Sequence, residues 1–169
     1  MNSSFELPIS KIKVRIPLRR RELISRTRLI DALFDQLEKR LLLIVAPAGY
    51  GKTSLLVDLA QQSELPFCWL SLDSLDQEPQ RFLGYLIASI AERFPGFGRD
   101  SLAALGSMAF FDQDEERLLV TITNEINSQI RDHFVLVMDD YHLVANIPAI
   151  AHVVNRFLQL TGENVHLIL

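Results

Sequence analysis

The feature that most constrains this chain is an apolar run, a glycine-bearing loop and a helical pattern that follow one another directly. Leu41-Leu-Leu-Ile-Val45 predicts a buried strand, and Ala46-Pro-Ala-Gly-Tyr-Gly51 predicts a turn-rich loop. The helix that follows is expected over residues 52–62. A buried strand that feeds a helix through a short loop is typical of a parallel α/β sheet, because parallel neighbours need crossover connections.

Further apolar runs and amphipathic stretches extend this alternation along the chain. Strands are predicted at 67–72, 134–138 and 165–169, and helices at 28–40, from Pro79 to Phe94, and over 102–108. A longer helix is predicted with Asp112 as its N-cap, Glu115 completing a capping box, and a buried face that runs to Ile130. The pattern predicts an α/β fold of three layers, with a mostly parallel sheet between helices.

The loop carries the pattern of a phosphate-binding site, Gly49-Tyr50-Gly51-Lys52-Thr53, and predicts the P-loop NTPase class. Its glycines allow a tight turn that brings backbone N–H groups to phosphate oxygens, and the helix start adds the positive end of its dipole. Lys52 is expected at the β- and γ-phosphates, and the Thr53 hydroxyl at Mg²⁺. The strict pattern has glycine where this chain has Ala46, and the alternative reading is an ordinary glycine turn. The predicted nucleotide-binding residues of the loop are Ala48, Gly49, Tyr50, Gly51, Lys52, Thr53 and Ser54.

A second motif, Asp139-Asp140, follows the apolar run 134–138 and has the form of a Walker B site. Asp139 is expected to hold Mg²⁺ through a water molecule, since magnesium prefers oxygen ligands. Asp140 is expected to polarise the attacking water, which makes Asp140 and Lys52 the predicted catalytic residues. Read without the upstream loop, the same pair would be a solvated turn.

Composition excludes several other classes of function. The formal charge of −4 and the pI near 5.5 provide no broad positive field, so this segment is not expected to bind nucleic acid by itself. The single cysteine, Cys68, excludes an intramolecular disulfide, and no apolar run approaches the roughly 20 residues that span a bilayer. A cytoplasmic protein without a membrane partner is expected.

Taken together, the motifs resemble the ATPase domain of the large ATP-binding LuxR-type transcriptional regulators, the MalT-like members of the STAND class. The resemblance covers most of the chain from about Pro17 onward and includes four blocks in order. These blocks are Leu23-Ile-Ser-Arg26 with Arg28-Leu29, the loop 46–53, Trp69-Leu-Ser-Leu-Asp73 with Arg81-Phe-Leu83 and Tyr85-Leu86, and Asp139-Asp-Tyr-His142. The order and combination are much more specific than any single motif.

The resemblance implies a switch that rests with ADP, self-associates with ATP in the full-length protein, and is reset by slow hydrolysis. It implies that Ile24 and Arg26, in a lead-in segment of residues 1–27, lie near the adenine, and that residues 28–169 form the NTPase core. It also implies that the strand 165–169 inserts between the loop strand and the Walker B strand. A sensor region and a C-terminal DNA-binding helix-turn-helix would lie beyond this sequence, which therefore resembles an N-terminal fragment with an incomplete sheet.

Three functions are compatible with these residues. The first is an ATP-binding, slowly hydrolysing switch module of a bacterial LuxR/MalT-type regulator. The second is a small phosphotransferase related to nucleoside kinases, although no arginine-rich lid follows the loop and two adjacent carboxylates suit water activation better. The third is a degenerate nucleotide-binding fragment, which would be recognised by low solubility or molten behaviour.

Overall fold

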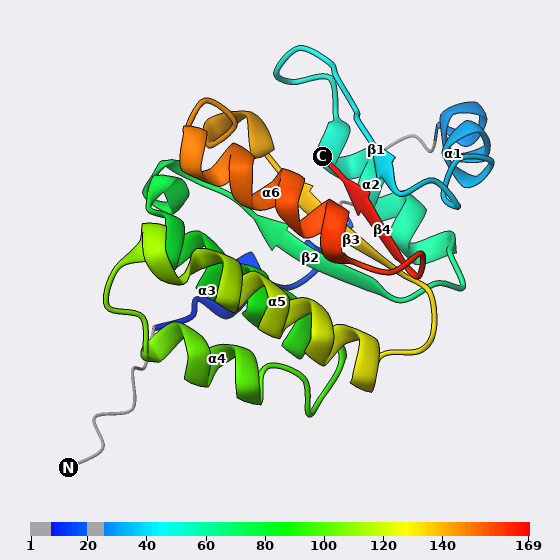
Figure 1. Ribbon diagram of the computed structural model, residues 1–169. Coiled ribbons are helices and arrows are strands. Elements are labelled where there is room, and N and C mark those ends of the chain that lie inside the picture. The colour runs from blue at the N-terminus through cyan, green and yellow to red at the C-terminus, as the bar shows by residue number, and fades with distance from the viewer. Residues whose placement is uncertain (1–7, 20–25) are drawn as a thin grey trace.

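The computed structural model describes residues 8–19 and 26–169 and has a sheet of parallel strands at its centre. The strands are β1 (Leu41–Leu42), β2 (Phe67–Ser71), β3 (Phe134–Asp139) and β4 (Val165–Ile168), in the order β1-β4-β3-β2. All three pairings are parallel, as Figure 1 shows. The predicted insertion of the last strand between the loop strand and β3 is therefore confirmed.

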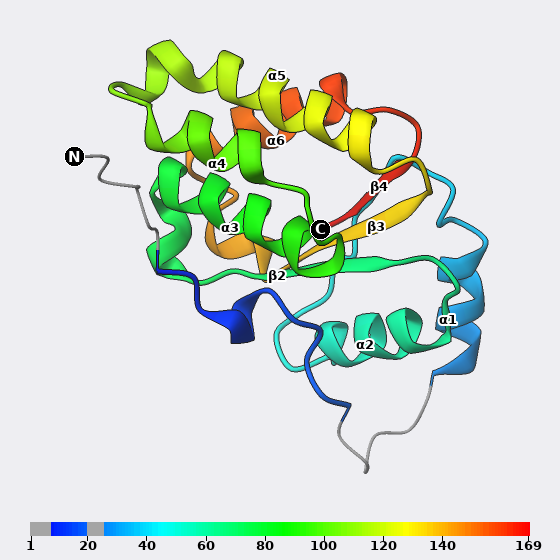
Figure 2. The same ribbon diagram turned by 90° about the horizontal axis from the view of Figure 1, so that it is seen from below.

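Helices cover both faces of this sheet, which confirms the predicted three-layer fold (Figures 1 and 2). One face packs against α1 (Thr27–Phe34) and α2 (Lys52–Gln62). The other packs against α3 (Pro79–Arg93), α5 (Phe111–Gln129) and α6 (Pro148–Leu160), and α4 (Arg99–Gly106) lies against α3 and α5.

The side chains of β3 contribute to the hydrophobic cores on both faces of the sheet. Every residue of β3 is buried, and successive side chains point to opposite faces. Leu136 and Met138 join the core beneath α3, α5 and α6, while Val135 and Val137 join the core beneath α1 and α2. A strand buried on both faces needs a continuous apolar run, which is the pattern that the sequence shows here.

Several predicted boundaries differ from the structure. The helix expected at 28–40 ends at Phe34, because the bonds from Leu37 N–H to Phe34 O and from Lys39 N–H to Gln36 O reach back only three residues. The strand expected at 41–45 is assigned only over Leu41–Leu42, although Ile44 N–H still donates to Leu169 O at 2.8 Å. The prediction that this strand is buried is wrong, because β1 lies at the edge of the sheet and Leu41, Leu43 and Val45 are exposed. Helix α6 was not assigned from the sequence.

The predicted capping box of the long helix is wrong. Helix α5 begins at Phe111, and its N-cap, Phe110, makes no side-chain capping bond. Asp112 therefore lies inside the first turn, and it is the Asp114 carboxylate that accepts a bond from Ala109 N–H. Phe111 is partly buried against the core, and the helix begins two residues earlier than the polar pattern predicts.

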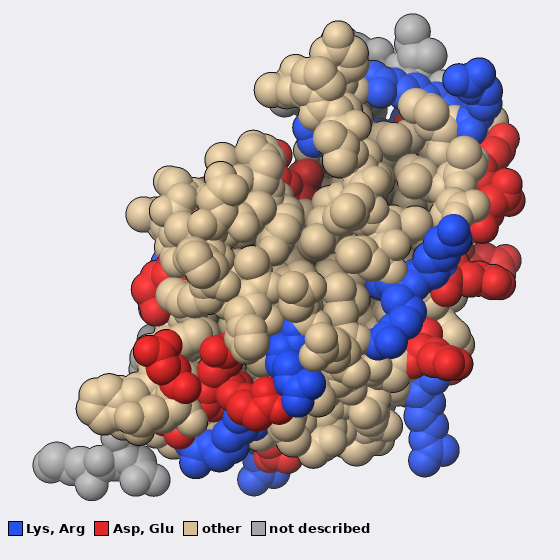
Figure 3. Space-filling model, turned by 45° about the horizontal axis from the view of Figure 1, so that its top comes forward, with Lys and Arg blue, Asp and Glu red and all other residues tan. Residues whose placement is uncertain are grey.

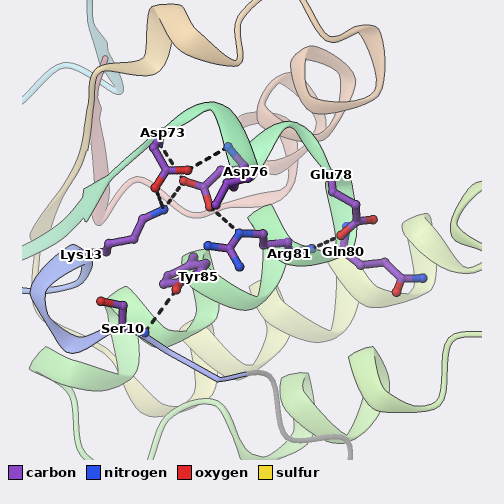
Figure 4. Close-up of polar contacts among 9 residues, drawn as sticks. Ser10, Lys13, Asp73, Asp76, Glu78, Gln80, Arg81 and Tyr85 are labelled. Carbon is purple, nitrogen blue, oxygen red and sulfur yellow. Dashed lines mark hydrogen bonds and ion pairs between the residues drawn. The ribbon is translucent and has the colours of Figure 1, made fainter.

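The N-terminal residues 8–19 are held to the sheet by a buried ionic network (Figure 4). The Asp76 carboxylate is fully buried, and it pairs with Lys13 and, at 3.0 Å, with the guanidinium of Arg81. Lys13 also reaches Asp73 at 2.9 Å, and its ammonium lies 4.5 Å from the centre of the Tyr85 ring. This network joins the segment 8–19 to the chain that leads from β2 into α3.

Within the described residues, no helix is both long and apolar enough to cross a membrane.

Candidate functional site

The loop of residues 46–53 connects β1 to α2 through two left-handed glycines. Gly49 has φ +83° and Gly51 has φ +74°, values that cost other residues roughly 1–2 kcal/mol. Gly51 is the N-cap of α2 and has no side chain with which to cap the helix. The first N–H groups of α2 therefore have no side-chain cap, and a helix start of this kind attracts anions.

Lys52 closes the loop on itself. Its ammonium donates to the carbonyl oxygen of Ala46 at 2.7 Å, so the first and seventh residues of the loop are joined. The side chain is half-buried and contributes to the wall of the cavity described below. A positive charge is thus held beside the start of α2, where a phosphate would need it.

Thr53 and Asp139 bring the two sequence motifs into contact. The Thr53 hydroxyl donates to Asp139 Oδ2 at 2.8 Å, across 86 residues of sequence. Asp139 ends β3 and pairs in register with Ser71 of β2. It is only 6% exposed, and this burial raises the pKa of its carboxyl despite the hydrogen bond from Thr53; the neighbouring charge of Asp140 raises it further.

Asp140 adopts an unusual backbone conformation directly after β3. Its φ of +59° and ψ of +31° are left-handed. Among the described residues, Asp140 is the only one other than glycine with a positive φ. Aspartate tolerates this region better than most residues. The turn leaves its side chain 48% exposed, with Oδ1 3.8 Å from His142 Nδ1, and lets its N–H donate to Asp139 Oδ1 at 3.1 Å. The two carboxylates therefore differ sharply in their access to water.

These groups line one cavity of about 840 Å³, within the size range of nucleotide and cofactor sites. It lies at the carboxyl ends of the strands, where ligands of open parallel sheets bind. Its lining includes the predicted residues Ala48, Gly49, Gly51, Lys52, Thr53, Asp139 and Asp140.

Three of the predicted residues that the structure describes are not part of the cavity lining. Tyr50 is exposed, and Ser54 lies on α2 next to Thr53. Arg26 lies against the loop and donates to Tyr50 O at 2.7 Å. Ile24 lies outside the described residues.

Other lining residues were not predicted as site residues. They include Tyr141, His142, Leu143 and Ala145 from the turn after β3, Leu169 from the end of β4, and Leu43 to Ala46 from the approach to the loop. For Tyr141 and His142 the sequence does carry a signal, because both belong to the block Asp139-Asp-Tyr-His142. The apolar members have no sequence signal that separates them from core residues.

The comparisons with known proteins find relatives among transcriptional regulators. No protein-family model matches the chain. The chain is 34% identical over 157 residues to the HTH-type transcriptional regulator MalT of Cronobacter sakazakii, covering 92% of this chain. It is 36% identical over 158 residues to the regulator of that name from Yersinia enterocolitica, and 34% identical over 161 residues to that from Serratia proteamaculans. The chain spans 17% of the length of these relatives. The resemblance to MalT-like regulators is thereby confirmed.

Proposed function

We propose that this chain, related to MalT regulators over more than nine-tenths of its length, binds ATP and ADP with Mg²⁺ at the cavity between the loop 46–53 and Asp139-Asp140. The observation that carries the proposal is the 2.8 Å bond between the Thr53 hydroxyl and Asp139. It places the two motifs side by side, next to Lys52, in a cavity large enough for a nucleotide.

The residues present fit a magnesium ion and a phosphate chain. A hydroxyl and a carboxylate oxygen are the ligands that a hard cation prefers, and the bond from Thr53 to Asp139 lies where such an ion would be held. Thr53 would ligate the ion directly and Asp139 through water. When bound, Mg²⁺ supplies charge neutralisation at the phosphates.

Each residue of the site has a separate task in this proposal. Lys52 exchanges the Ala46 carbonyl for phosphate oxygens, because an ammonium gains more from an anion than from a neutral carbonyl. Asp139 provides fixed negative charge in a dry position. Asp140, which is half exposed and lines the cavity, orients and polarises the water that attacks the terminal phosphate.

We further propose that ATP binding acts as a signal switch in a longer cytoplasmic regulator. The relatives are named HTH-type transcriptional regulators, which supports a role in transcription regulation with DNA bound through a helix-turn-helix elsewhere in the protein. Self-association would accompany the ATP state, and slow hydrolysis would end it.

The test is equilibrium binding of a fluorescent ATP analogue with Mg²⁺, with ADP as competitor. Lys52→Ala is expected to weaken binding by tenfold or more, since a charge-assisted contact to phosphate is lost. Lys39→Ala removes an exposed lysine outside the cavity lining and is the matched control. Equal affinity of the wild-type chain and Lys52→Ala would refute the proposed site.

Product analysis separates a switch ATPase from a phosphotransferase. In the proposal, ATP yields ADP and inorganic phosphate at a low rate without any acceptor, and Asp140→Asn slows this release without weakening ATP binding. ADP formation that requires a small hydroxyl acceptor, with the phosphate recovered on that acceptor, would instead favour a kinase.

A further inference from the structure

Arg26 approaches the loop from outside the cavity. It is the N-cap of α1, and its Nη1 donates to the carbonyl oxygen of Tyr50 at 2.7 Å, across 24 residues of sequence. It is not part of the cavity lining. The described hydrogen bond of the Arg26 side chain is therefore with the backbone of the loop, outside the cavity lining.

The guanidinium also packs closely on Gly51. A Cβ atom added to Gly51 would lie 3.1 Å from Arg26 Nη2 and 3.6 Å from its Cζ. The 3.1 Å distance is tighter than an ordinary van der Waals contact, so a Cβ at position 51 would displace the guanidinium by a few tenths of an ångström. At Gly49, which has a similar φ, the same construction finds no atom within 4 Å.

The bond from Arg26 to the Tyr50 carbonyl indicates where the Gly51 N–H points. Tyr50 C=O and Gly51 N–H belong to one planar peptide unit, and the described residues contain no cis peptide bond. In a trans peptide the C=O and N–H point in opposite directions, so a carbonyl held by Arg26 turns the N–H away from Arg26. Gly51 lines the cavity, and none of the described residues accepts a hydrogen bond from its N–H.

We propose that Arg26 is a positioning residue for the phosphate site, which acts through the Tyr50–Gly51 peptide and not through the base of the nucleotide. It holds the Gly51 N–H toward the position of the phosphates before they bind. A planar guanidinium suits this task because it can donate to the carbonyl and lie flat on the glycine, which a lysine ammonium cannot do. The inference rests on the proposed nucleotide site and assigns a role to Arg26 within it.

The test uses a ligand without a base. Affinities for MgATP, MgGTP and magnesium tripolyphosphate are measured on the wild-type chain, Arg26→Ala, Arg26→Lys and the control Arg28→Ala, an exposed arginine of α1. Arg26→Ala is expected to weaken ATP and tripolyphosphate by the same factor, about tenfold, with the ratio of ATP to GTP affinity unchanged. Arg26→Lys is expected to recover only part of the loss. Unchanged tripolyphosphate affinity, or an altered ATP to GTP ratio, would overturn the proposal in favour of a base contact.

A ligand-free measurement separates this inference from the proposed function. In ¹⁵N-resolved NMR spectra of the free chain, Arg26→Ala should displace the Gly51 amide resonance, and Arg28→Ala should not. A Gly51 resonance that stays in place in Arg26→Ala would overturn the positioning role even if the wild-type chain binds ATP. A displaced resonance in a chain whose wild type binds neither ATP nor tripolyphosphate would instead reject the proposed function, and with it the phosphate role of Arg26.

Discussion

At the scale of single residues, Asp139 has opposite effects on stability and on the proposed chemistry. Its carboxyl is buried beside Asp140, and burial raises its pKa, which means that the charged form is held in an unfavourable environment. A magnesium ligand has to be charged, so the proposed site requires the less stable form. Buried carboxylates whose pKa is raised are characteristic of functional sites.

We therefore predict that Asp139→Asn stabilises the ligand-free chain. Asparagine can accept the bond from Asp140 N–H and donate to the Thr53 hydroxyl without a charge to desolvate. In buffer with a chelator at neutral pH, the melting temperature should rise by about 2–4 °C, the shift that 1 kcal/mol causes in a chain of this size. Asp140→Asn, which changes an exposed side chain, should change it less. A lower melting temperature for Asp139→Asn would contradict the prediction.

At the scale of elements, helix α4 shows how a distant residue can replace a missing cap. Its N-cap is Gly98, which has φ +100° and no side chain. Glu125 of α5 accepts bonds from Gly98 N–H and Ser101 N–H, each at 2.9 Å, and from the Ser101 hydroxyl. Burial raises the pKa of the Glu125 carboxyl, but these hydrogen bonds outweigh burial and leave the pKa below its ordinary value.

Glu125→Gln should destabilise the chain in a pH-dependent way. The free energy of unfolding is expected to fall by roughly 1.5–3 kcal/mol near pH 7, because several N–H groups lose a charged acceptor. A carboxyl whose pKa is lowered by folding stabilises the folded chain at pH values above its ordinary pKa of 4.5. This contribution disappears as the pH falls through the pKa of the folded state. Urea unfolding is measured from pH 3 to 7 on the wild-type chain and on Glu125→Gln. The difference in their free energies of unfolding should become smaller as the pH falls. Glu163→Gln, an exposed site, should show no such trend.

At the scale of the whole molecule, the sheet ends at an apolar edge. Leu41 of β1 and Leu43 and Val45 just after it are exposed, and they alternate with the half-buried Leu42 and Ile44. Figure 3 shows a broad surface on this side of the molecule that is almost free of charged side chains. Exposed, uncharged strand edges promote association.

Val45→Lys should reduce aggregation of the isolated chain without changing its thermal stability. Val45 is 92% exposed, so a lysine costs little folding energy there and adds a charge at the open edge. Light scattering of concentrated samples should show fewer large particles than the wild-type chain. Leu18→Lys is the matched control, since Leu18 is 95% exposed and belongs to the N-terminal segment 8–19, not to β1. If both variants reduced aggregation equally, the added net charge alone would explain the effect.

The sequence by itself determined the fold class and the residues of the central loop. The order of strand, loop and helix around Lys52 needs only local information, since glycines set the turn and an apolar run precedes it. That Leu41, Leu43 and Val45 are exposed could not be read from this run, because it has the same pattern as a strand buried on both faces. The pair Thr53 and Asp139 was also predictable, because Thr53 completes the loop pattern and Asp139 ends the apolar run of β3. The central place of β4 followed from the resemblance.

The tertiary structure decided the features that depend on contacts between distant segments. The cap of α4 comes from Glu125, the start of α5 from the packing of Phe111, and the orientation of the Gly51 amide from Arg26. None of these pairings leaves a local pattern, because each joins residues that meet only after the helices have packed on the sheet. The left-handed turn at Asp140, which sets how the two carboxylates differ in exposure, belongs to the same class.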